Sequence, residues 1–368
     1  MKPDAAAQYM DLDKIVKEAD HFLCRKPVHI TSVRAANSKG DPHAFYSNGD
    51  YWWPNPDTPD GLPFIQRDGE TYPGIFTAHR MILREMRRVV THLAAAFHIT
   101  GRQGYADAAA SWLRTFFLAE DTRMAPHLCY AQAIPGVSDG RGIGIIDTMH
   151  LIDVPPAIEL VRGALTPGEY DDLKAWFQTY LHWMNTHPNG LDEREWSNNH
   201  AVMWYAQATA FARFTADENM LAFCRDRFKT QLVAGQMAAD GSFPAELART
   251  KPYYYASMTL DALAMICLHA SSAEDNLWHY QMDDGRGLPQ AIGYLLPFIE
   301  DKSRWPYPPD IEHHEALPVA MPYMLFAGLA YNDTWLLSLW QRLPQHPENE
   351  EIRRSIAIRC PYVYLALA

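Results

Sequence analysis

The sequence predicts an all-α protein of the α/α-toroid class, with about six to seven helix pairs in a single domain over residues 1–368. Apolar residues recur with helical periodicity along most of the chain, whereas convincing alternating strand patterns are few. The connections between the expected helices are mostly short, which favours antiparallel helix pairs. A twisted bundle and a helical solenoid are the competing arrangements, although no repeat of fixed length supports a regular solenoid.

The clearest helix starts at Thr166. Thr166 has the character of an N-cap, Pro167 fits the first helical position and Glu169 completes a capping box. One apolar stripe follows, formed by Leu173, Trp176, Phe177, Tyr180, Leu181 and Met184. Similar Thr/Ser-x-x-Glu patterns at Thr215 and Ser271 predict two further helix starts.

Ten other segments carry helical periodicity. We expect helices near 12–24, 76–98, 104–118, 145–162, 196–214, 217–236, 256–269, 287–299, 316–330 and 333–342. Two long segments, 28–73 and 121–144, resist this assignment. Long ordered loops in a compact domain are usually functional, so we expect these two segments to be active-site loops.

The overall composition limits which binding partners and which cellular compartments are expected for this protein. The formal net charge is −12, which argues against nucleic-acid binding because phosphate binders need a basic face. No run of about 18 apolar residues predicts a membrane span. The five cysteines are scattered without a CxxC motif, which predicts buried free thiols. Residues 1–13 lack the apolar core of a signal peptide, so we expect a cytoplasmic protein, or a periplasmic or secreted one if a signal was removed.

Two polar clusters carry the predicted chemistry. One is the Asn-Asn-His run at 198–200, and the other runs from Arg249 to Tyr255. Taken alone, the first is typical of a helix cap with a satisfied histidine, and the second of an Arg249–Glu246 pair beside packed tyrosines. Together they supply an amide, an imidazole, a guanidinium and a phenol. A β-elimination on a uronic acid needs this set, to neutralise the carboxylate, remove the C5 proton and protonate the leaving O4.

Each group has an expected role in this reaction. Asn199 and Arg249 would bind the carboxylate, and His200 would neutralise it as a cation or act as a base when neutral. Tyr255 would protonate the leaving oxygen and, as a tyrosinate, could first take the C5 proton. In β-D-mannuronate and β-D-glucuronate both groups lie on one ring face, so Tyr255 suffices. In α-L-guluronate they lie on opposite faces, so His200 would be the base and Tyr255 the acid.

The two clusters resemble the signatures of the alginate lyase superfamily of polysaccharide lyases, most closely polysaccharide lyase family 38. The similar stretches are Trp196–His200, Glu246–Tyr255, Tyr51–Pro56, Tyr130–Gly136 and Gly140–Gly144. The resemblance implies an α/α toroid, elimination at 1,4-linked uronates of alginate or glucuronan, and catalytic roles for Asn199, His200, Arg249 and Tyr255. In family 5 the tyrosine lies one position later, where this chain has Ala256, so Tyr255 fits the family 38 pattern better.

Further residues of these motifs are expected to contact the substrate, an anionic polysaccharide. Trp52 and Trp53 could stack on sugar rings, the alternative being that they anchor the long loop. The expected substrate-binding set is Trp52, Trp53, Asn55, Gln132, Arg141, Lys251, Tyr253 and Tyr254. The run Glu312–Glu315 suggests a metal, but adjacent ligands would point in different directions and HExxH is absent. We therefore expect no metal or cofactor. Separately, we expect a monomer.

Two other functions compete with an endo-acting polyuronate lyase that leaves C4=C5 unsaturated ends. A glycoside hydrolase needs two carboxylates flanking the bond. The available acidic residues, with no spacing that pairs them, are Asp147, Asp153, Glu193, Glu195 and Glu246. A non-catalytic protein could instead bind sugars on its aromatic residues. Among lyase substrates, the economy of a single acid/base residue favours β-D-glucuronan or mannuronate-rich alginate.

Overall fold

The computed structural model describes residues 6–368, whose contacts divide the chain into two compact units. Unit 1 extends to Asp192 and includes Ile358–Ala368, and unit 2 is Glu193–Ala357. Helices take up 59% of the chain and strands 4%, so the all-α class is confirmed. The single domain over residues 1–368 stays a prediction.

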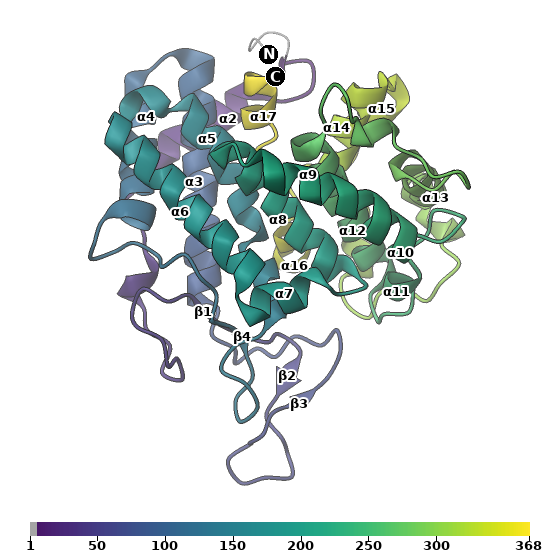
Figure 1. Cartoon of the computed structure of the whole chain (residues 1–368), viewed down its shortest axis with the longest axis horizontal. Coiled ribbons are helices and arrows are strands. Elements are labelled where there is room, and N and C mark those ends of the chain that lie inside the picture. Colours follow the sequence, from purple (N-terminus) through teal and green to yellow (C-terminus); the bar gives the residue numbers. More distant parts are fainter. Residues whose placement is uncertain (1–5) are drawn as a thin grey trace. The chain divides into compact units, whose positions relative to one another are not determined.

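Unit 1 is built around the long helix α3 (Ala78–Thr100), which buries an apolar face that includes Leu83 and Leu93. The helices that contact α3 are α2 (Leu12–Phe22), α4 (Gln103–Leu113), α5 (Val154–Leu160) and α17 (Tyr362–Leu367) (Figure 1). Helix α3 ends at Gly101, whose φ of 71° is the left-handed conformation that favours glycine at a helix end.

Helix α6 (Pro167–Thr186) confirms the predicted start at Thr166. The Thr166 side chain accepts from the backbone N–H of Glu169, and the Glu169 carboxylate accepts from that of Thr166. All six residues of the predicted apolar stripe are buried. Helix α7 (Pro188–Arg194) follows and was not predicted.

The two long non-helical segments of unit 1 contain four short strands. Strand β1 (Tyr46–Asn48) pairs in parallel with β4 (Tyr130–Ala133), and β2 (Trp52–Trp53) pairs antiparallel with β3 (Ile65–Gln66). A short 3-10 helix, η1 (Ile30–Ser32), precedes them. These strands lie at one end of α3 (Figure 1). The prediction that both segments are not α-helical is confirmed.

Two predicted helices of unit 1 differ from the structure. The 104–118 segment is α4 followed by a π-helical turn, η2 (Arg114–Leu118). The 145–162 segment is a 3-10 helix, η3 (Gly142–Asp153), followed by α5 and the 3-10 turn η4 (Arg162–Ala164). Pro155 and Pro156 lack the N–H groups needed to continue an α-helix from η3, so α5 begins immediately before them.

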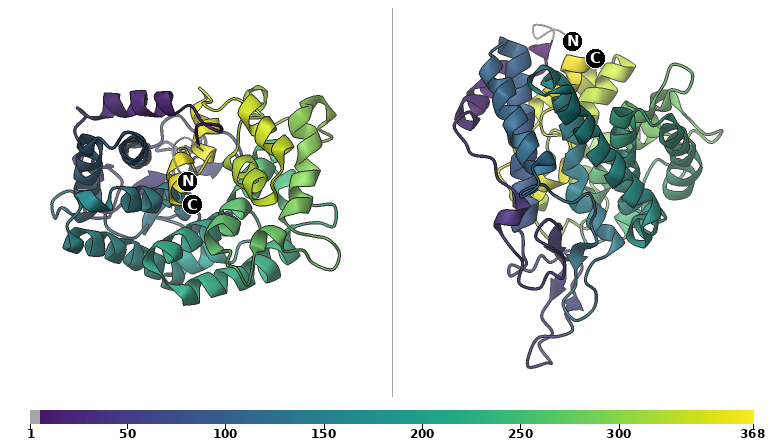
Figure 2. Two further views of the ribbon diagram at one scale, coloured as in Figure 1. Left: turned by 90° about the horizontal axis from the view of Figure 1, so that it is seen from above. Right: turned by 60° about the vertical axis from the view of Figure 1, so that its left-hand side comes forward.

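Unit 2 is built on two buried helices that pack together, α8 (Asn199–Thr215) and α12 (Pro252–Ala270). Helix α9 (Glu218–Arg227) contacts both of them. Helix α12 also contacts α11 (Pro244–Leu247), α13 (Leu288–Glu300) and α14 (Pro322–Tyr331). Helix α15 (Thr334–Arg342) packs on α14 (Figure 2). The carboxylate of Glu246, which precedes the 249–255 cluster, accepts from Asn199, so the two predicted clusters at the N-termini of α8 and α12 belong to one packed region.

Shorter elements complete unit 2. They are η5 (Phe228–Val233), α10 (Ala234–Gln236), η6 (Leu277–His279), η7 (Lys302–Arg304), η8 (His314–Ala316) and α16 (Glu350–Ser355). The predicted 217–236 helix is thus α9, a π-helical turn and α10. The predicted 316–330 helix begins only at Pro322, because prolines at 318 and 322 prevent an earlier start.

Two predicted helix starts in unit 2 are wrong. Thr215 is the last residue of α8, and the N-cap of α9 is Asp217, which accepts from Met220 N over 3.0 Å. No helix begins at Ser271, which follows the end of α12 and accepts from Leu277 N. A Ser/Thr-x-x-Glu pattern can therefore also lie at the end of a helix, as Thr215 and Ser271 do.

Three of the five cysteines, Cys224, Cys267 and Cys360, are buried free thiols as predicted, whereas the free thiol of Cys24 is exposed. In the described range 6–368, no helix combines the length and apolar character needed to cross a membrane.

Candidate active site

The Asn-Asn-His run forms the N-terminus of α8. Asn198 is the N-cap, and its side chain accepts from the backbone N–H of His200 over 3.1 Å. This cap fixes the first turn of the helix and therefore the direction in which the side chains of Asn199 and His200 leave it. The helix predicted near 196–214 is confirmed, and it begins three residues later than expected, at Asn199.

Asn199 is held by the carboxylate of Glu246 from α11. Its backbone N–H donates to Glu246 Oε1 over 2.6 Å, and its side-chain Nδ2 donates to Oε2 over 2.7 Å. Asn199 is 0% exposed and Glu246 is 1% exposed. Burial raises the pKa of the Glu246 carboxyl, opposed by the hydrogen bonds from Asn199. The structure therefore gives Asn199 a clear role in linking α8 to the segment before α12.

His200 is paired with a different carboxylate. Its Nδ1 lies 2.8 Å from Oε1 of Glu193, which comes from the last turn of α7. Glu193 is 0% exposed, whereas the His200 side chain is 17% exposed. The Trp196 ring lies 5.9 Å from the imidazole ring, centroid to centroid, and Trp196 is 41% exposed. His200 therefore combines a buried anchor at Nδ1 with partial access to solvent.

Arg249 and Tyr255 meet at the start of α12. The Arg249 Nη2 donates to the Tyr255 hydroxyl over 3.3 Å, and its Cζ lies 4.3 Å from the centre of the phenol ring. The backbone N–H of Arg249 also donates to the Glu246 carbonyl, which connects this pair to the Asn199 anchor. A guanidinium at a phenol oxygen stabilises negative charge there, as a proton-transferring tyrosine requires.

Tyr253 and Tyr254 lie on other sides of α12 and are buried. The Tyr253 hydroxyl donates to the Phe298 carbonyl over 3.2 Å, and the Tyr254 hydroxyl donates to the Glu351 carbonyl over 3.3 Å. Burial raises the pKa of both phenols. These contacts argue against the predicted substrate-binding roles, because both hydroxyls are already engaged inside the protein.

The start of α12 is capped by Asp310. Its two carboxylate oxygens accept from the backbone N–H groups of Tyr253 and Tyr254 over 2.9 and 3.0 Å. Burial is the main cause that raises the pKa of Asp310, to about 6. This cap fixes the helix turn that carries the three tyrosines.

Lys251 does not match its predicted role. It is 1% exposed, and its Nζ lies 2.8 Å from Glu312 Oε2 and 3.7 Å from Glu351 Oε1. A buried ammonium between two carboxylates balances their charges rather than reaching an anionic sugar. Lys251 adjoins the reactive cluster in sequence, but its side chain is turned into the protein, and these contacts disfavour a substrate-binding role.

In unit 1 the structure brings three predicted substrate-binding residues together. The Arg141 guanidinium lies 5.6 Å from the centre of the Trp52 ring, and its Nε donates to the Gln132 carbonyl over 2.8 Å. The Gln132 side chain in turn donates to Asp147 Oδ1 over 3.1 Å. Asp147 also binds Arg80, with Nε 3.0 Å from Oδ2. Trp52 of β2 and Arg141, which directly precedes η3, thus place an aromatic ring and a guanidinium side by side.

Trp53 and Asn55 are tied to the local loop. The indole N–H of Trp53 donates to the Glu70 carbonyl over 2.9 Å, and Arg67 lies over its ring. The Asn55 side chain accepts from Asp57 N over 3.0 Å, which is an Asx turn. For Trp53 the anchoring alternative fits these contacts better than sugar stacking.

The acidic run 312–315 does not converge on a common point. Glu312 pairs with Lys251, His313 Nδ1 lies 3.0 Å from Asn349, and His314 Nδ1 accepts from Asp310 N. No group of three or more potential metal ligands occurs among the described residues. The run therefore has structural partners that account for three of its four side chains.

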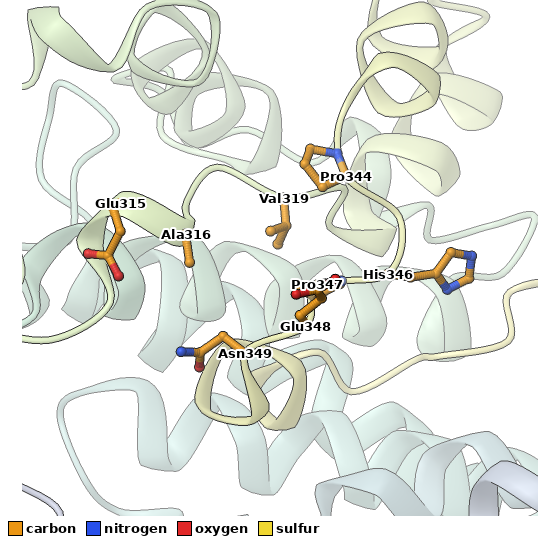
Figure 3. Close-up of a pocket in the computed structure, with 8 residues that line it drawn as sticks. All are labelled: Glu315, Ala316, Val319, Pro344, His346, Pro347, Glu348 and Asn349. Carbon is orange, nitrogen blue, oxygen red and sulfur yellow. The ribbon is translucent and has the colours of Figure 1, made fainter.

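Glu315, the fourth, faces a pocket of about 610 Å³. Its lining is Glu315, Ala316, Val319, Pro344, His346, Pro347, Glu348 and Asn349 (Figure 3). None of these is a predicted site residue, and none is Lys or Arg. Two carboxylates without a lining Lys or Arg suit a polyanionic substrate poorly, so the candidate site stays with the clusters of α8 and α12.

The carboxylates available to a glycoside hydrolase are mostly engaged. Asp153 is 0% exposed and its Oδ2 lies 3.1 Å from Arg87. Glu193 and Glu246 are buried against His200 and Asn199, and Asp147 is paired with Arg80. Glu195 is exposed but pairs with its neighbour Arg194. These contacts disfavour a pair of carboxyls free to flank a glycosidic bond.

Sequence reasoning missed Glu193 and Glu246 as partners of the site. The sequence indicates them only as candidate acids, and Glu246 also as a partner for Arg249. The spacing of three residues between Glu246 and Arg249 hinted at a local link, which the structure shows as a backbone hydrogen bond. No sequence signal links Glu193 to His200, because the contact depends on how α7 turns into α8.

Solved structures of alginate lyases are similar to this chain over most of its length. An alginate lyase from Bacteroides ovatus is 29% identical with a TM-score of 0.83, covering 96% of this chain and 92% of that chain. Two variants of alginate lyase A1-III with a tetrasaccharide are 15% and 13% identical, with TM-scores of 0.56 and 0.55. Each of these covers 90% of this chain and 89% of its own, and shows the fold alone. Curated proteins gave no match.

The helical architecture and these neighbours define the class of the protein, a polysaccharide lyase with the α/α-toroid fold. A family model described as alginate lyase matches residues 29–305. The chain therefore belongs to the alginate lyase family. The matched range includes both polar clusters and the motifs around Trp52 and Gln132.

Proposed function

We propose that the protein cleaves a 1,4-linked uronate polysaccharide by β-elimination, with Tyr255 as the residue that carries the proton. The observation that supports this most is the hydrogen bond from Arg249 Nη2 to the Tyr255 hydroxyl, 3.3 Å long. A phenolate stabilised by a guanidinium can take the C5 proton, and the phenol can then protonate the leaving O4.

The other groups have distinct roles in the proposal. Arg249 and His200 neutralise the uronate carboxylate, so that charge developing at C5 is stabilised as it forms. His200 as a neutral base remains the alternative for an α-L-guluronate substrate. Asn199 supports the site through its two hydrogen bonds to Glu246, and its second amide hydrogen is the one that could serve a carboxylate.

The proposed substrates are β-D-glucuronan and mannuronate-rich alginate. In both, one residue on one ring face can take the proton and return it, and the Tyr255–Arg249 pair supplies such a residue. Within unit 1, the Trp52–Arg141 pair combines an aromatic face with a cation beside it, which by itself is suited to an acidic sugar.

A substrate panel tests the proposal. The enzyme is incubated with poly-mannuronate, poly-guluronate and β-D-glucuronan, and the rise in ultraviolet absorbance from the C4=C5 double bond is followed. We expect a rise with one of the two β-D polymers. Activity confined to poly-guluronate would transfer the base role to His200, and no rise with any of the three would overturn the proposal.

A further inference from the structure

Glu193 is the most deeply buried acidic group beside the candidate site, and its carboxylate makes few hydrogen bonds. It is 0% exposed, and the hydrogen bond from its Oε1 to His200 Nδ1 is 2.8 Å long. Its Oε2 is buried and has no hydrogen-bond partner in the structure. A buried carboxylate is costly unless a partner compensates it. Here that compensation is concentrated on the imidazole.

This contact determines where His200 carries its hydrogen. A carboxylate only accepts hydrogen bonds, so Nδ1 must bear a hydrogen whether the ring is neutral or cationic. In the neutral ring Nε2 then has the free lone pair, and in the cation Nε2 carries a second N–H. Among the described residues, Nε2 has no hydrogen-bond partner, while the side chain is partly exposed. Both roles considered for His200 use this nitrogen.

We propose that Glu193 is a positioning residue, which holds the Nδ1 hydrogen of His200 and thereby presents Nε2 to the uronate. The proposal deepens the proposed function and rests on it. Glu193 does not touch the substrate. His200 also acts to lower the pKa of the Glu246 carboxyl, but that carboxylate is already the acceptor for Asn199. The ring orientation is thus assigned to Glu193.

The neighbouring residue Glu195 provides a matched control. Glu193→Gln and Glu195→Gln remove the same charge two positions apart. Glu195 is 52% exposed at its side chain and pairs with Arg194, whereas Glu193 faces His200. A general change in local charge would affect both variants alike, and loss of ring positioning would affect only Glu193→Gln.

The first measurement is the nitrogen NMR spectrum of the His200 ring in the full-length wild-type protein, at a pH where the ring is neutral. The signal is assigned by its absence in His200→Gln. We expect hydrogen on Nδ1. Hydrogen on Nε2 would overturn the proposal, and this readout does not depend on any enzymatic activity.

The second measurement compares the kinetics of the two variants on the best polymer of the panel. We expect Glu193→Gln to lower kcat by roughly tenfold or more with little change in KM, as loss of an orienting partner does. Glu195→Gln should resemble the wild type, and equal effects would overturn the proposal. If Glu193→Gln does not fold, the wild-type spectrum decides alone. If the wild type forms no unsaturated product, the proposed function fails while the spectrum still reports on Glu193.

Discussion

The guanidinium of Arg249 lies over the ring of Tyr255, with its Cζ 4.3 Å from the ring centre and its Nη2 donating to the phenol oxygen over 3.3 Å. A single cation thus contacts both the face and the oxygen of one tyrosine. This relationship separates Tyr255 from its two neighbours in sequence, whose hydroxyls donate to backbone carbonyls. It is the structural basis for giving Tyr255 the proton-transfer role.

Replacing Tyr255 by Phe should abolish most of the activity and leave the fold intact. The change removes the proposed proton carrier, and general acid–base groups contribute about 10²–10⁴-fold to the rate. Tyr254→Phe is the matched control, because it removes a buried hydroxyl bonded to the Glu351 carbonyl at a net stability cost of about 1 kcal/mol. Initial rates of absorbance increase report the activity, and thermal unfolding reports the fold. Full activity in Tyr255→Phe would move the role to another residue.

Replacing Glu246 by Ala should destabilise the protein. The backbone N–H and the Nδ2 of Asn199 would both lose their acceptor inside the protein, and an unsatisfied buried donor costs about 1–3 kcal/mol. Glu195→Ala should change the free energy of unfolding by less than about 1 kcal/mol, since it breaks only an exposed ion pair. Urea unfolding followed by circular dichroism measures both. Similar losses in the two variants would refute the anchoring role of Glu246.

Replacing Trp196 by Ala should weaken substrate binding more than it slows the chemical step. The ring is 41% exposed and lies beside the His200 imidazole, where it can stack on a sugar bound at that histidine. We expect KM to rise with kcat nearly unchanged. Trp335 on α15 is 38% exposed and provides the control. If Trp335→Ala raises KM equally, the loss of any exposed tryptophan accounts for the effect, and the stacking role of Trp196 is wrong.

The cap at Asp310 should make stability depend on pH. Burial raises its pKa from 3.8 to about 6, so the folded protein binds this proton more tightly than the unfolded chain. A group whose pKa is raised on folding contributes stability that is complete below pH 3.8 and is lost as the pH rises through 6. The wild type should therefore lose stability relative to Asp310→Asn between pH 4 and pH 6, by on the order of 1–3 kcal/mol. Urea unfolding of both proteins across this range measures the difference, and a wild type that gains stability relative to Asp310→Asn as the pH rises would contradict this sign.

The fold was predictable where local signals agree with one another. Helix α6 has an N-cap, a proline at its first position, a capping box and one apolar stripe, and it forms as predicted. The 145–162 segment is apolar enough for a helix, but Pro155 and Pro156 interrupt its hydrogen-bond ladder. The pattern at Ser271 failed because the same side chain can bond to a following turn.

The residue types of the candidate site were predictable from the sequence, but the directions in which their side chains point were less so. Successive residues of an α-helix are rotated by about 100° about its axis, so Tyr253, Tyr254 and Tyr255 point to three different sides. Sequence cannot show which side faces which neighbour. The partners Glu193 and Glu246 depend on how α7 and α11 approach the start of α8, and such contacts follow from tertiary packing.

The central claim is that the glycosidic bond is broken by elimination. Product analysis in water enriched in heavy oxygen tests it most directly. The enzyme digests β-D-glucuronan or poly-mannuronate in this water, and the new chain ends are examined by mass spectrometry. Elimination predicts unsaturated ends, each one water lighter than a hydrolysis product, with no heavy oxygen incorporated during cleavage. Saturated ends that carry heavy oxygen from the cleavage step would contradict the account and identify a hydrolase.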